Sequence, residues 1–281
     1  MKSIVVTGVS TGIGKSVAET LIQKGFHVFG SVRKHADAER LKSDLGTGFT
    51  PLTFDVTDEA AVHAAAQQVR EKLNGETLFG LVNNAGVAVS APILHYKIEE
   101  FRKQMEVNVT GQLIVTQAFA PLLGADRSLK GKPGRIVNIS SSSGKNGNPF
   151  LGAYSASKHA LEGMSESMRR ELMLFGIDVI IVAPGPIATP IWDKAEEVDV
   201  EQYRHTEYYE PGKKFQKYTI AKGHNGLPSA AVSKVVFKAL TVSNPRVRYA
   251  VNPNPLRSWL ISLLPKRQLD AMIAKGLGLQ K

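Results

Sequence analysis

Tyr154 and Lys158 are the residues of this sequence whose types and spacing most clearly suit catalysis. They stand four residues apart in a stretch with a helical pattern, so both side chains project from one face. A free tyrosine has a pKa near ~10 and is a poor base at neutral pH. A neighbouring ammonium lowers that pKa, so the pair is expected to act as a general acid and base. An ordinary surface contact is the alternative.

Two further polar residues could assist this pair. Ser141 follows a short apolar run at 135–139, and its hydroxyl can orient a substrate oxygen. Asn108 lies within a predicted helix at 98–119, where asparagine is locally unfavourable, which indicates a role for its side chain. Ser141 belongs to a run of serines at 140–143, and a structural role in a turn stays open for its neighbours.

A glycine-rich loop follows the first apolar run of the chain, at 4–6. It reads Thr7-Gly8-Val9-Ser10-Thr11-Gly12-Ile13-Gly14 and leads into a helical pattern. A glycine turn between a strand and a helix lets backbone N–H groups and the helix dipole bind a pyrophosphate. A tight turn without a ligand is the alternative, but the position after the first strand favours nucleotide binding. The expected contacts are Gly8, Ser10, Thr11, Gly12, Ile13 and Gly14.

The end of the second apolar run, at 27–32, bears on the choice of nucleotide. NAD-binding chains usually place Asp or Glu there to bind the ribose 2′-hydroxyl. Here Arg33 and Lys34 occupy that position. Because a guanidinium can pair with a 2′-phosphate, NADP(H) is predicted in preference to NAD(H). Solvated loop charges are the alternative, and Asp37 slightly later complicates the assignment.

Short β-branched runs alternate with longer helical patterns along the chain, which indicates a parallel sheet with crossover helices. The strand runs are near-continuous apolar runs rather than alternating ones, which suits strands that are buried on both faces. The predicted fold class is therefore α/β, a Rossmann-type doubly wound parallel sheet in a single domain. The expected strands are 4–6, 27–32, 52–54, 79–82, 135–139, 177–182 and 249–251. The expected helices are 13–24, 58–73, 98–119, 152–175 and 232–242.

The domain organisation follows from where this alternation weakens. Residues 1–251 are expected to form the dinucleotide-binding and catalytic domain, and 252–281 a helical C-terminal extension. Residues 186–225 mix Pro, Gly, charges and aromatic residues, and are predicted to be a substrate lid. The lid aromatics, with Phe150 and Leu151, can line an apolar pocket or pack the lid onto the core. They are Trp192, Tyr203, Tyr208, Tyr209, Phe215 and Tyr218.

The ordered motifs resemble those of the short-chain dehydrogenase/reductase family over about residues 3–192. The resemblance rests on the G-x-x-x-G-x-G loop at Gly8, Asn83-Asn84-Ala85-Gly86, Asn108, Ser141, Tyr154-Ser155-Ala156-Ser157-Lys158 and Pro184-Gly185. It implies hydride transfer between nicotinamide and an alcohol or carbonyl carbon, with Asn108, Ser141, Tyr154 and Lys158 as catalytic residues. It also implies that Lys158 holds the nicotinamide ribose and that Asn108 positions Lys158 through a water.

The resemblance extends the set of expected nucleotide contacts. Asp55 and Val56 look like the adenine-contacting pair, although Asp55 can instead be a helix cap. Asn84 can touch the cofactor or only tie strand ends together. The expected set, besides the loop and Arg33, is Asp55, Val56, Asn84, Tyr154, Lys158, Pro184, Ile187 and Thr189.

The intact set of Ser141, Tyr154 and Lys158 favours an NADP(H)-dependent enzyme over an NADP(H)-binding sensor with little turnover. The end of the second strand and the long C-terminal extension look most like the branch that acts on steroids, retinoids and other lipophilic carbonyls. A small apolar alcohol or carbonyl compound is therefore the expected substrate. The family resemblance also implies a homodimer or homotetramer, formed through the helices at about 98–120 and 152–175.

Composition excludes several other classes of protein. With 43% hydrophobic and 21% charged residues, the 281-residue chain can bury a core and is not of the disordered class. It has no cysteine, which excludes a disulfide framework and fits the cytoplasm. No His and carboxylate cluster has ligand spacing, so no metal is predicted. No signal peptide or membrane-spanning stretch is predicted.

The net charge of +10 is concentrated towards the C-terminus. Residues 244–281 contain seven Lys or Arg and a single acid, Asp270. Such a balance can serve a nucleic acid, an anionic membrane or a polyanionic cofactor, or be a solvated surface. No nucleic-acid-binding motif is present, so no nucleic-acid partner is predicted. The apolar stretch at 259–264 can touch a membrane peripherally, cover the pocket or form an oligomer interface, and packing on the protein is the preferred interpretation.

Overall fold

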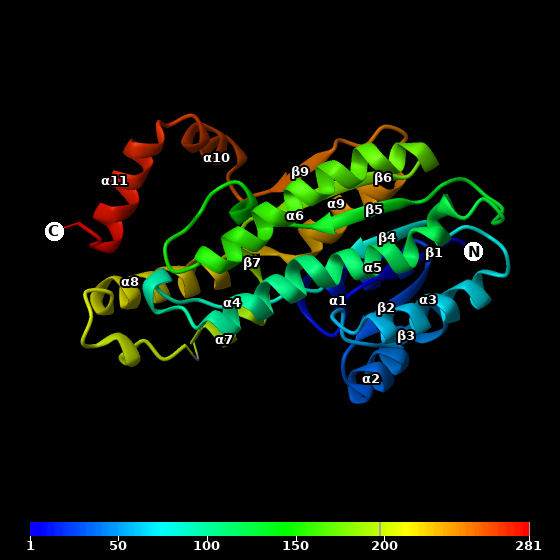
Figure 1. Cartoon of the computed structure of the whole chain (residues 1–281), viewed down its shortest axis with the longest axis horizontal. Helices are drawn as coiled ribbons and strands as arrows, with labels where there is room; N and C mark the ends of the chain where they lie inside the picture. Colours follow the sequence, from blue (N-terminus) through cyan, green and yellow to red (C-terminus); the bar gives the residue numbers. More distant parts are fainter. Residues whose placement is uncertain (197, 281) are drawn as a thin grey trace.

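A parallel sheet of seven strands organises the chain in the computed structural model, which describes residues 1–196 and 198–280 (Figure 1). The strand order is β3-β2-β1-β4-β5-β6-β9. The chain moves outward from β1 to β3 and then returns to the other side of β1, so the order reverses between β1 and β4. Ligands of open α/β sheets bind beside this switch point, outside the carboxyl ends of the strands. The predicted doubly wound fold is confirmed. The strands are β1 Ser3–Val6, β2 His27–Val32, β3 Phe49–Thr53, β4 Gly80–Asn83, β5 Arg135–Ile139, β6 Asp178–Pro184 and β9 Arg248–Val251.

Helices cover both faces of the sheet, and α5 and α6 cross its near side in Figure 1. The helices of the main body are α1 Gly12–Gln23, α2 His35–Leu45, α3 Glu59–Leu73, α4 Ile98–Met105, α5 Gly111–Phe119, α6 Gly152–Glu171 and α9 Ser229–Thr241.

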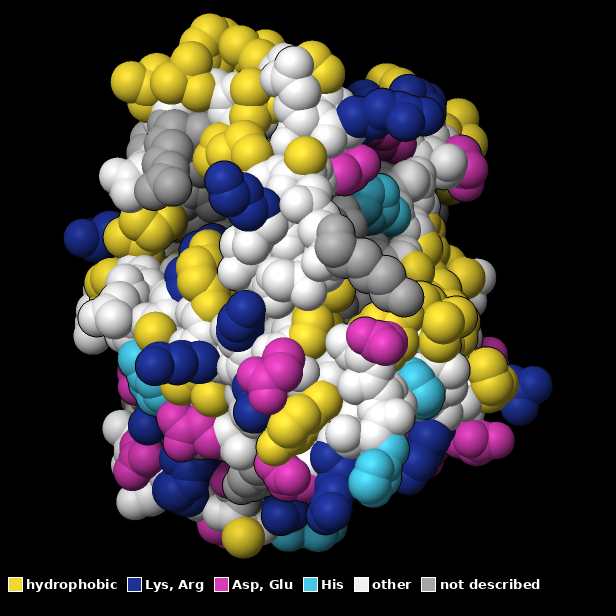
Figure 2. Space-filling view, turned by 90° about the vertical axis from the view of Figure 1, so that its left-hand side faces the viewer, with side chains coloured by type: hydrophobic (Ala, Val, Ile, Leu, Met, Phe, Trp, Pro, Cys, Tyr) yellow, Lys and Arg dark blue, Asp and Glu magenta, His cyan; other side chains and the backbone are white. Residues whose placement is uncertain are grey.

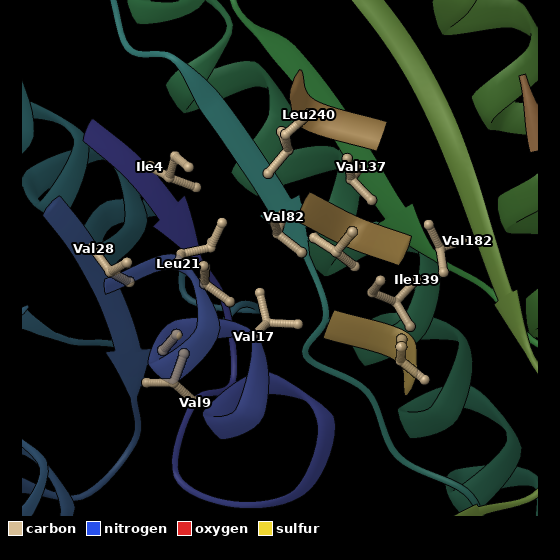
Figure 3. Close-up of a cluster of buried hydrophobic side chains, with 14 of the residues drawn as sticks. Ile4, Val9, Val17, Leu21, Val28, Val82, Val137, Ile139, Val182 and Leu240 are labelled. Carbon is tan, nitrogen blue, oxygen red and sulfur yellow. The ribbon is translucent and has the colours of Figure 1, made fainter. Parts of the chain in front are cut away.

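The alternation of side chains along each strand divides the interior into two cores. Ile4 and Val6 of β1 join one cluster, in which α1 and α9 pack against the sheet (Figure 3). Val5, between them, points to the opposite face and joins a second cluster with residues of α3 and α5. All three side chains are fully buried. Because both faces are covered, β1 is apolar at every buried position, as the sequence predicted.

Three elements differ from the sequence predictions. Residues 35–45 form α2, for which no helix was predicted. The predicted helix at 98–119 is divided by a π-helical turn, Glu106–Thr110, between α4 and α5. The third strand begins at Phe49 rather than 52 and contains Pro51. Pro51 is tolerated because β3 is an edge strand.

The predicted lid contains more regular structure than a loop. It includes β7 Ile187–Ala188, α7 Ile191–Glu196 and α8 Tyr209–His224, and β7 pairs with β8 Leu227–Pro228 just beyond the lid's predicted end at 225. A Cβ at Gly223 would lie 2.2 Å from the Trp192 ring, so α8 can approach that ring only because residue 223 is glycine. The Trp192 indole donates a hydrogen bond to the Ile187 carbonyl at 2.6 Å, which ties α7 to β7 within the lid.

The C-terminal extension consists of α10 Pro255–Ser262 and α11 Lys266–Leu277. Both helices stand apart from the sheet, and α11 approaches α8 (Figure 1). The preferred interpretation was that the stretch at 259–264 packs on the protein. Ile261 and Leu264 are partly buried, whereas Trp259, Leu260 and Leu263 are all more than half exposed.

Within the described ranges, no helix has the length and apolar character needed to cross a membrane.

Candidate active site

The glycine-rich loop has the geometry of a phosphate cradle. Gly8 and Gly12 have φ values of +71° and +60°, a region that favours glycine. A Cβ at Gly14 would lie 2.1 Å from the Gly8 carbonyl oxygen, so only glycine allows the helix to begin this close to the turn. The Thr11 side chain makes no capping hydrogen bond at the start of α1, and no acid stands in the first turn. The helix N-terminus therefore suits an anionic phosphate.

Residues from two neighbouring strands hold the loop in place. The Asn84 amide, just after β4, donates to the carbonyls of Thr7 and Gly8 at 2.8 and 3.0 Å. The Thr7 hydroxyl accepts from the backbone N–H groups of Asn84 and Ala85. Ser31 of β2 accepts from the Gly8 N–H at 3.0 Å. Of the two roles left open for Asn84, these contacts support the tying of strand ends. The sequence prediction did not include Thr7 or Ser31.

The predicted catalytic side chains meet at the carboxyl ends of β4 and β5. Ser141 follows β5 and is hydrogen-bonded to the Tyr154 phenol. The Lys158 ammonium lies 5.8 Å from the centre of the Tyr154 ring and donates to the Ile139 carbonyl at 2.9 Å. Lys158 is buried, whereas Tyr154 keeps some exposed surface, as a residue that meets a substrate must. The Tyr154–Lys158 pair on α6 is thus not an exposed surface contact.

Asn108 is positioned by the π-helical turn. Its side chain accepts from the Val87 N–H and donates to the Val87 carbonyl, both at 2.8 Å, and donates to the Ser157 hydroxyl at 3.0 Å. It is fully buried. A Cβ at Gly86 would lie 3.1 Å from the Asn108 Oδ1 and 3.8 Å from the Lys158 Nζ, so both groups flank that glycine. π-turns inside α-helices are frequent at functional sites.

The protonation states differ from the expectation for the isolated pair. Burial raises the pKa of the Tyr154 phenol, and the hydrogen bond with Ser141 opposes this effect. Burial lowers the pKa of Lys158 to about 8, while the Glu162 carboxylate acts in the opposite direction. The surroundings therefore raise the pKa of Tyr154, whereas the sequence predicted that Lys158 lowers it. Near pH 7, Tyr154 is a neutral phenol and Lys158 is mostly protonated, so Tyr154 is prepared to donate a proton.

The polar end of β2 contains a second set of charges. The exposed Arg33 lies 3.8 Å from the Asp55 carboxylate. Arg40 of α2 donates to the Ser10 carbonyl at 3.0 Å and to the Asp37 carboxylate at 2.7 Å. Asp37 is thus paired with Arg40. It is therefore not an unpaired acid of the kind that binds the ribose 2′-hydroxyl of NAD(H). The sequence prediction missed Arg40, whose α2 was itself not predicted.

The remaining predicted cofactor contacts lie in two segments of the chain. One contains Pro184, Ile187 and Thr189, and the other contains Asp55 and Val56. Thr189 lies beside the loop, since a Cβ at Gly12 would be 3.4 Å from its methyl group. Ile187 is buried in β7, and Pro184 ends β6 beside them in the chain. Val56 is also buried, packed against Gly111 of α5. Asp55 accepts hydrogen bonds from the N–H and hydroxyl of Thr57, as a turn residue does.

A buried carboxylate behind Lys158 was also missed. Glu162 lies one turn further along α6 and is 4% exposed. Arg248 of β9 donates to both of its oxygens at 2.9 to 3.2 Å, and the Ser140 hydroxyl donates at 2.9 Å. Lys145 lies 3.7 Å away. The Glu162–Arg248 pair joins positions 86 residues apart, so no local sequence pattern could reveal it.

An apolar hollow of about 290 Å³ lies beside the start of α6. Ile93, Phe150, Tyr208 and Leu279 line it together with Gly152, two residues before Tyr154. Phe150 has a φ of +61°, a strained conformation for a bulky residue that clusters at functional sites. Of the lid aromatics, Tyr208 lines the hollow, whereas Tyr203 and Phe215 are buried and Tyr218 is 57% exposed.

Residues 2–199 match the short chain dehydrogenase family. The chain belongs to this family. It is 41% identical over 278 residues to the NADPH-dependent 3-dehydrocapnine reductase of Ornithobacterium rhinotracheale, covering 99% of this chain and 98% of that protein. It is 31% identical over 286 residues to retinol dehydrogenase 7 of Mus musculus, covering 97% and 87%. A short chain dehydrogenase of Burkholderia cenocepacia J2315 in complex with NADP superposes with a TM-score of 0.72 at 25% identity, covering 97% and 99%. The recognition of the family from its motifs, including its retinol-type members, is confirmed, and the protein is an oxidoreductase.

Proposed function

We propose that this short-chain dehydrogenase is an NADP(H)-dependent reductase of a lipophilic ketone or aldehyde, with Tyr154 as the proton donor. The observation that carries the proposal is the neutral, partly exposed phenol of Tyr154 between Ser141 and the buried Lys158. A carbonyl oxygen that gains negative charge during reduction needs a proton donor. The protonated phenol of Tyr154 can donate that proton.

Each residue of the site has a defined task in this reaction. The Ser141 hydroxyl orients the carbonyl oxygen beside the Tyr154 phenol, which donates its proton to that oxygen. The Lys158 ammonium, held at the Ile139 carbonyl, stabilises the phenolate that remains. Asn108 fixes the segment at Val87 and Gly86, which borders Lys158. NADPH, when bound, supplies the hydride to the carbonyl carbon. The products are the alcohol and NADP⁺, and solvent returns a proton to Tyr154.

The choice of NADP(H) rests on the basic end of β2. Arg33 stands where NAD-binding chains usually carry an acid, and Asp37 is paired with Arg40. A 2′-phosphate would therefore meet guanidinium groups rather than an unpaired carboxylate. The relative from Ornithobacterium rhinotracheale is described as NADPH-dependent, and the relative from Burkholderia cenocepacia J2315 has NADP bound, which supports the same choice.

The choice of a lipophilic substrate rests on the apolar hollow beside the start of α6, where the lining residue Gly152 precedes Tyr154 by two residues. The walls of the hollow include Ile93, Phe150 and Leu279, so an apolar chain or ring placed there would be removed from water. A relative named for retinol supports this substrate class. The sheet domain of 1–251, with its lid at 186–225, would hold the substrate between α6 and α8. For the whole protein we propose a homodimer or homotetramer that is assembled through the helices at about 98–120 and 152–175. Light scattering on a sizing column measures its mass directly. We also propose a cytoplasmic location.

The decisive experiment compares Tyr154→Phe with a matched control. The variant should bind NADPH with wild-type affinity, measured by nicotinamide fluorescence, while reduction of a panel of lipophilic ketones and aldehydes falls by about 10²-fold to 10⁴-fold. Tyr218→Phe is the control, because Tyr218 and Lys222 have the same four-residue spacing on exposed α8, with their polar atoms 3.0 Å apart. The control should keep full activity.

The other outcomes are equally informative. NADPH binding by the wild-type protein without turnover on the whole panel would favour the sensor over the enzyme. Absence of binding to either nucleotide would contradict the assignment of the glycine-rich loop. Full activity of Tyr154→Phe would remove the proton donor from the mechanism.

A further inference from the structure

The short helix α10 presents its apolar stripe outwards. Leu256, Trp259, Leu260 and Leu263 recur with the spacing of one helix face, which in a globular protein normally faces the core. Here these side chains are 68%, 57%, 52% and 61% exposed. Hydrophobic side chains gather at the top of the face shown in Figure 2, at the height at which α10 and α11 lie in Figure 1. An exposed apolar face of this kind marks an interaction surface.

The charge of the same segment is strongly positive. Residues 252–281 contain five Lys or Arg and one acid, Asp270. Lys266, Arg267 and Lys275 are exposed on α11, which follows the apolar stripe directly. A helix that combines a Trp and Leu face with basic neighbours is typical of segments that lie in the interface of an anionic membrane.

We propose that α10 and the basic side chains of α11 form a docking surface for an anionic lipid bilayer. The apolar stripe would enter the boundary between headgroups and acyl chains, while Lys266, Arg267 and Lys275 would face lipid phosphates. A second copy of the chain is the less favourable occupant. A two-fold contact through this surface would bring two basic segments of two chains, each with a net charge of +10, against one another.

The C-terminal segment that contains the proposed docking surface also lines the hollow. Leu279, just after α11, lines the hollow beside the start of α6. Ile93 lines the same hollow and is 62% exposed, and its neighbour Leu94 is 78% exposed. The C-terminal segment therefore connects the proposed docking surface with the wall of the hollow. The link between this segment and substrate binding in the hollow rests on the proposed function, whereas the docking itself does not.

Vesicle co-sedimentation tests the docking surface without any substrate. The full-length protein should bind vesicles of phosphatidylcholine with phosphatidylglycerol and should bind pure phosphatidylcholine at least about tenfold more weakly. A Trp259→Glu, Leu260→Glu double variant should lose at least about tenfold in binding. Leu174→Glu is the matched control, since Leu174 is 72% exposed beyond the far end of α6, and it should bind like the wild-type protein. NADPH binding and circular dichroism check that each variant is folded.

A second pair of variants tests the charges. Lys266→Glu with Arg267→Glu should weaken vesicle binding by at least about tenfold, and raised salt should weaken the wild-type protein in the same direction. Lys130→Glu with Lys132→Glu, in the exposed loop before β5, is the control and should bind as the wild-type protein does. Failure of the wild-type protein to bind anionic vesicles would overturn the proposal. So would a set of α10 variants that bind vesicles normally but dissociate an oligomer in sedimentation velocity.

Discussion

Tyr154, Lys158 and Glu162 follow one another at four-residue intervals on α6, so a proton donor, a cation and a buried carboxylate share one helix face. Glu162 is buried and accepts hydrogen bonds from Arg248 and Ser140. It acts on Lys158 through charge, and Arg248 and Lys145 in turn surround it. Because the ammonium of Lys158 is desolvated, its protonated form depends on that carboxylate. Glu162 is therefore a positioning residue for the charge of the catalytic lysine.

Replacement of Glu162 by Gln should move the alkaline limb of the pH–rate profile. The pKa of Lys158 is about 8, lowered by burial and raised by Glu162. Loss of the carboxylate lowers this pKa further, and the positive charges of Arg248 and Lys145 remain nearby and act in the same direction. Lys158 then loses its proton at lower pH, so kcat should begin to fall at a lower pH than in the wild-type protein. Measurement of kcat between about pH 6 and pH 10 checks this shift.

Glu166→Gln is the matched control for this variant. Glu166 lies one turn further along α6, is exposed, and pairs with Arg170 at 3.5 Å. Its loss should leave the pH profile unchanged. Glu162→Gln should also lower the melting temperature, because it leaves the partly buried Arg248 without a counter-charge. A lowered melting temperature with an unshifted alkaline limb would show that Glu162 is only structural.

The nucleotide preference should change with Arg33. Arg33→Asp should weaken NADPH binding by about tenfold to a hundredfold, because a charge-assisted hydrogen bond is worth ~1.5–3 kcal/mol. The new acid would also stand beside Asp55, which lies 3.8 Å from the present guanidinium. NADH binding should be retained or improved. Arg102→Asp, on exposed α4, is the control, and parallel fluorescence titrations with both nucleotides decide the outcome. An unchanged ratio of the two affinities would refute the role of Arg33.

The sequence predicted Tyr154, Lys158 and Ser141 as one group, but not the protonation of Tyr154 or the contacts of Glu162. The Tyr154–Lys158 spacing and the position of Ser141 after a strand follow from local patterns. The raised pKa of Tyr154 depends on how much protein surrounds the phenol, and that quantity is absent from the sequence. The Glu162–Arg248 pair depends on the approach of β9 to α6, which only the packed sheet creates. Local spacing is visible in a sequence, whereas desolvation and distant pairing are not.

Among the elements, the start of α1 should be the most sensitive to a single methyl group. Gly14→Ala would place a Cβ 2.1 Å from the Gly8 carbonyl oxygen and 2.5 Å from the Asn84 amide nitrogen. The loop must shift, so NADPH affinity should fall by at least about tenfold. Nicotinamide fluorescence measures this loss. Gly163→Ala in α6 is the control, since no atom lies within 4 Å of its added Cβ. That variant should keep NADPH affinity and gain slight stability from helix propensity.

The elements that the sequence missed share weak or misleading local signals. Within α2 only Ala38 and Leu41 are buried, so its apolar periodicity is faint. Pro211, Gly212 and Gly223 suggest a loop within α8, yet Pro211 lies in the first helical turn, where proline is tolerated. The π-turn at 106–110 adds one residue to a helix without disturbing its apolar pattern, so it cannot be predicted from periodicity. The strands were located from their short apolar runs, and β3, whose start was placed three residues late, is interrupted by Thr50 and Pro51.

At the scale of the whole molecule, one sheet connects two cores. The cluster around Ile4 and Val17 and the cluster around Val5 and Val115 lie on opposite faces of the same strands. If either cluster loses its packing, the β1 side chains that it covers become exposed. The strand that supports the other cluster is then no longer covered on both faces. Residues 1–251 are therefore expected to unfold as one cooperative unit. The C-terminal helices add little to either core, because the structure places no residue of α10 or α11, among those described, in the two clusters.

Deletion of residues 252–281 tests this division of the molecule. The shortened chain should keep a single sharp thermal transition by far-UV circular dichroism, with its midpoint within about 4 °C of the wild-type value, because the lost helices contribute little buried surface. NADPH affinity should be unchanged, since the glycine-rich loop and Arg33 lie far from the tail in the fold. KM for an apolar carbonyl substrate should rise by about fivefold or more, because the hollow loses the wall that Leu279 provides. A broad or two-step transition would mean that the tail is part of the folding unit, and an unchanged KM would place the substrate outside the hollow. A chain that melts normally, binds NADPH and handles apolar substrates poorly would assign nucleotide binding to the sheet and substrate retention to its C-terminal extension.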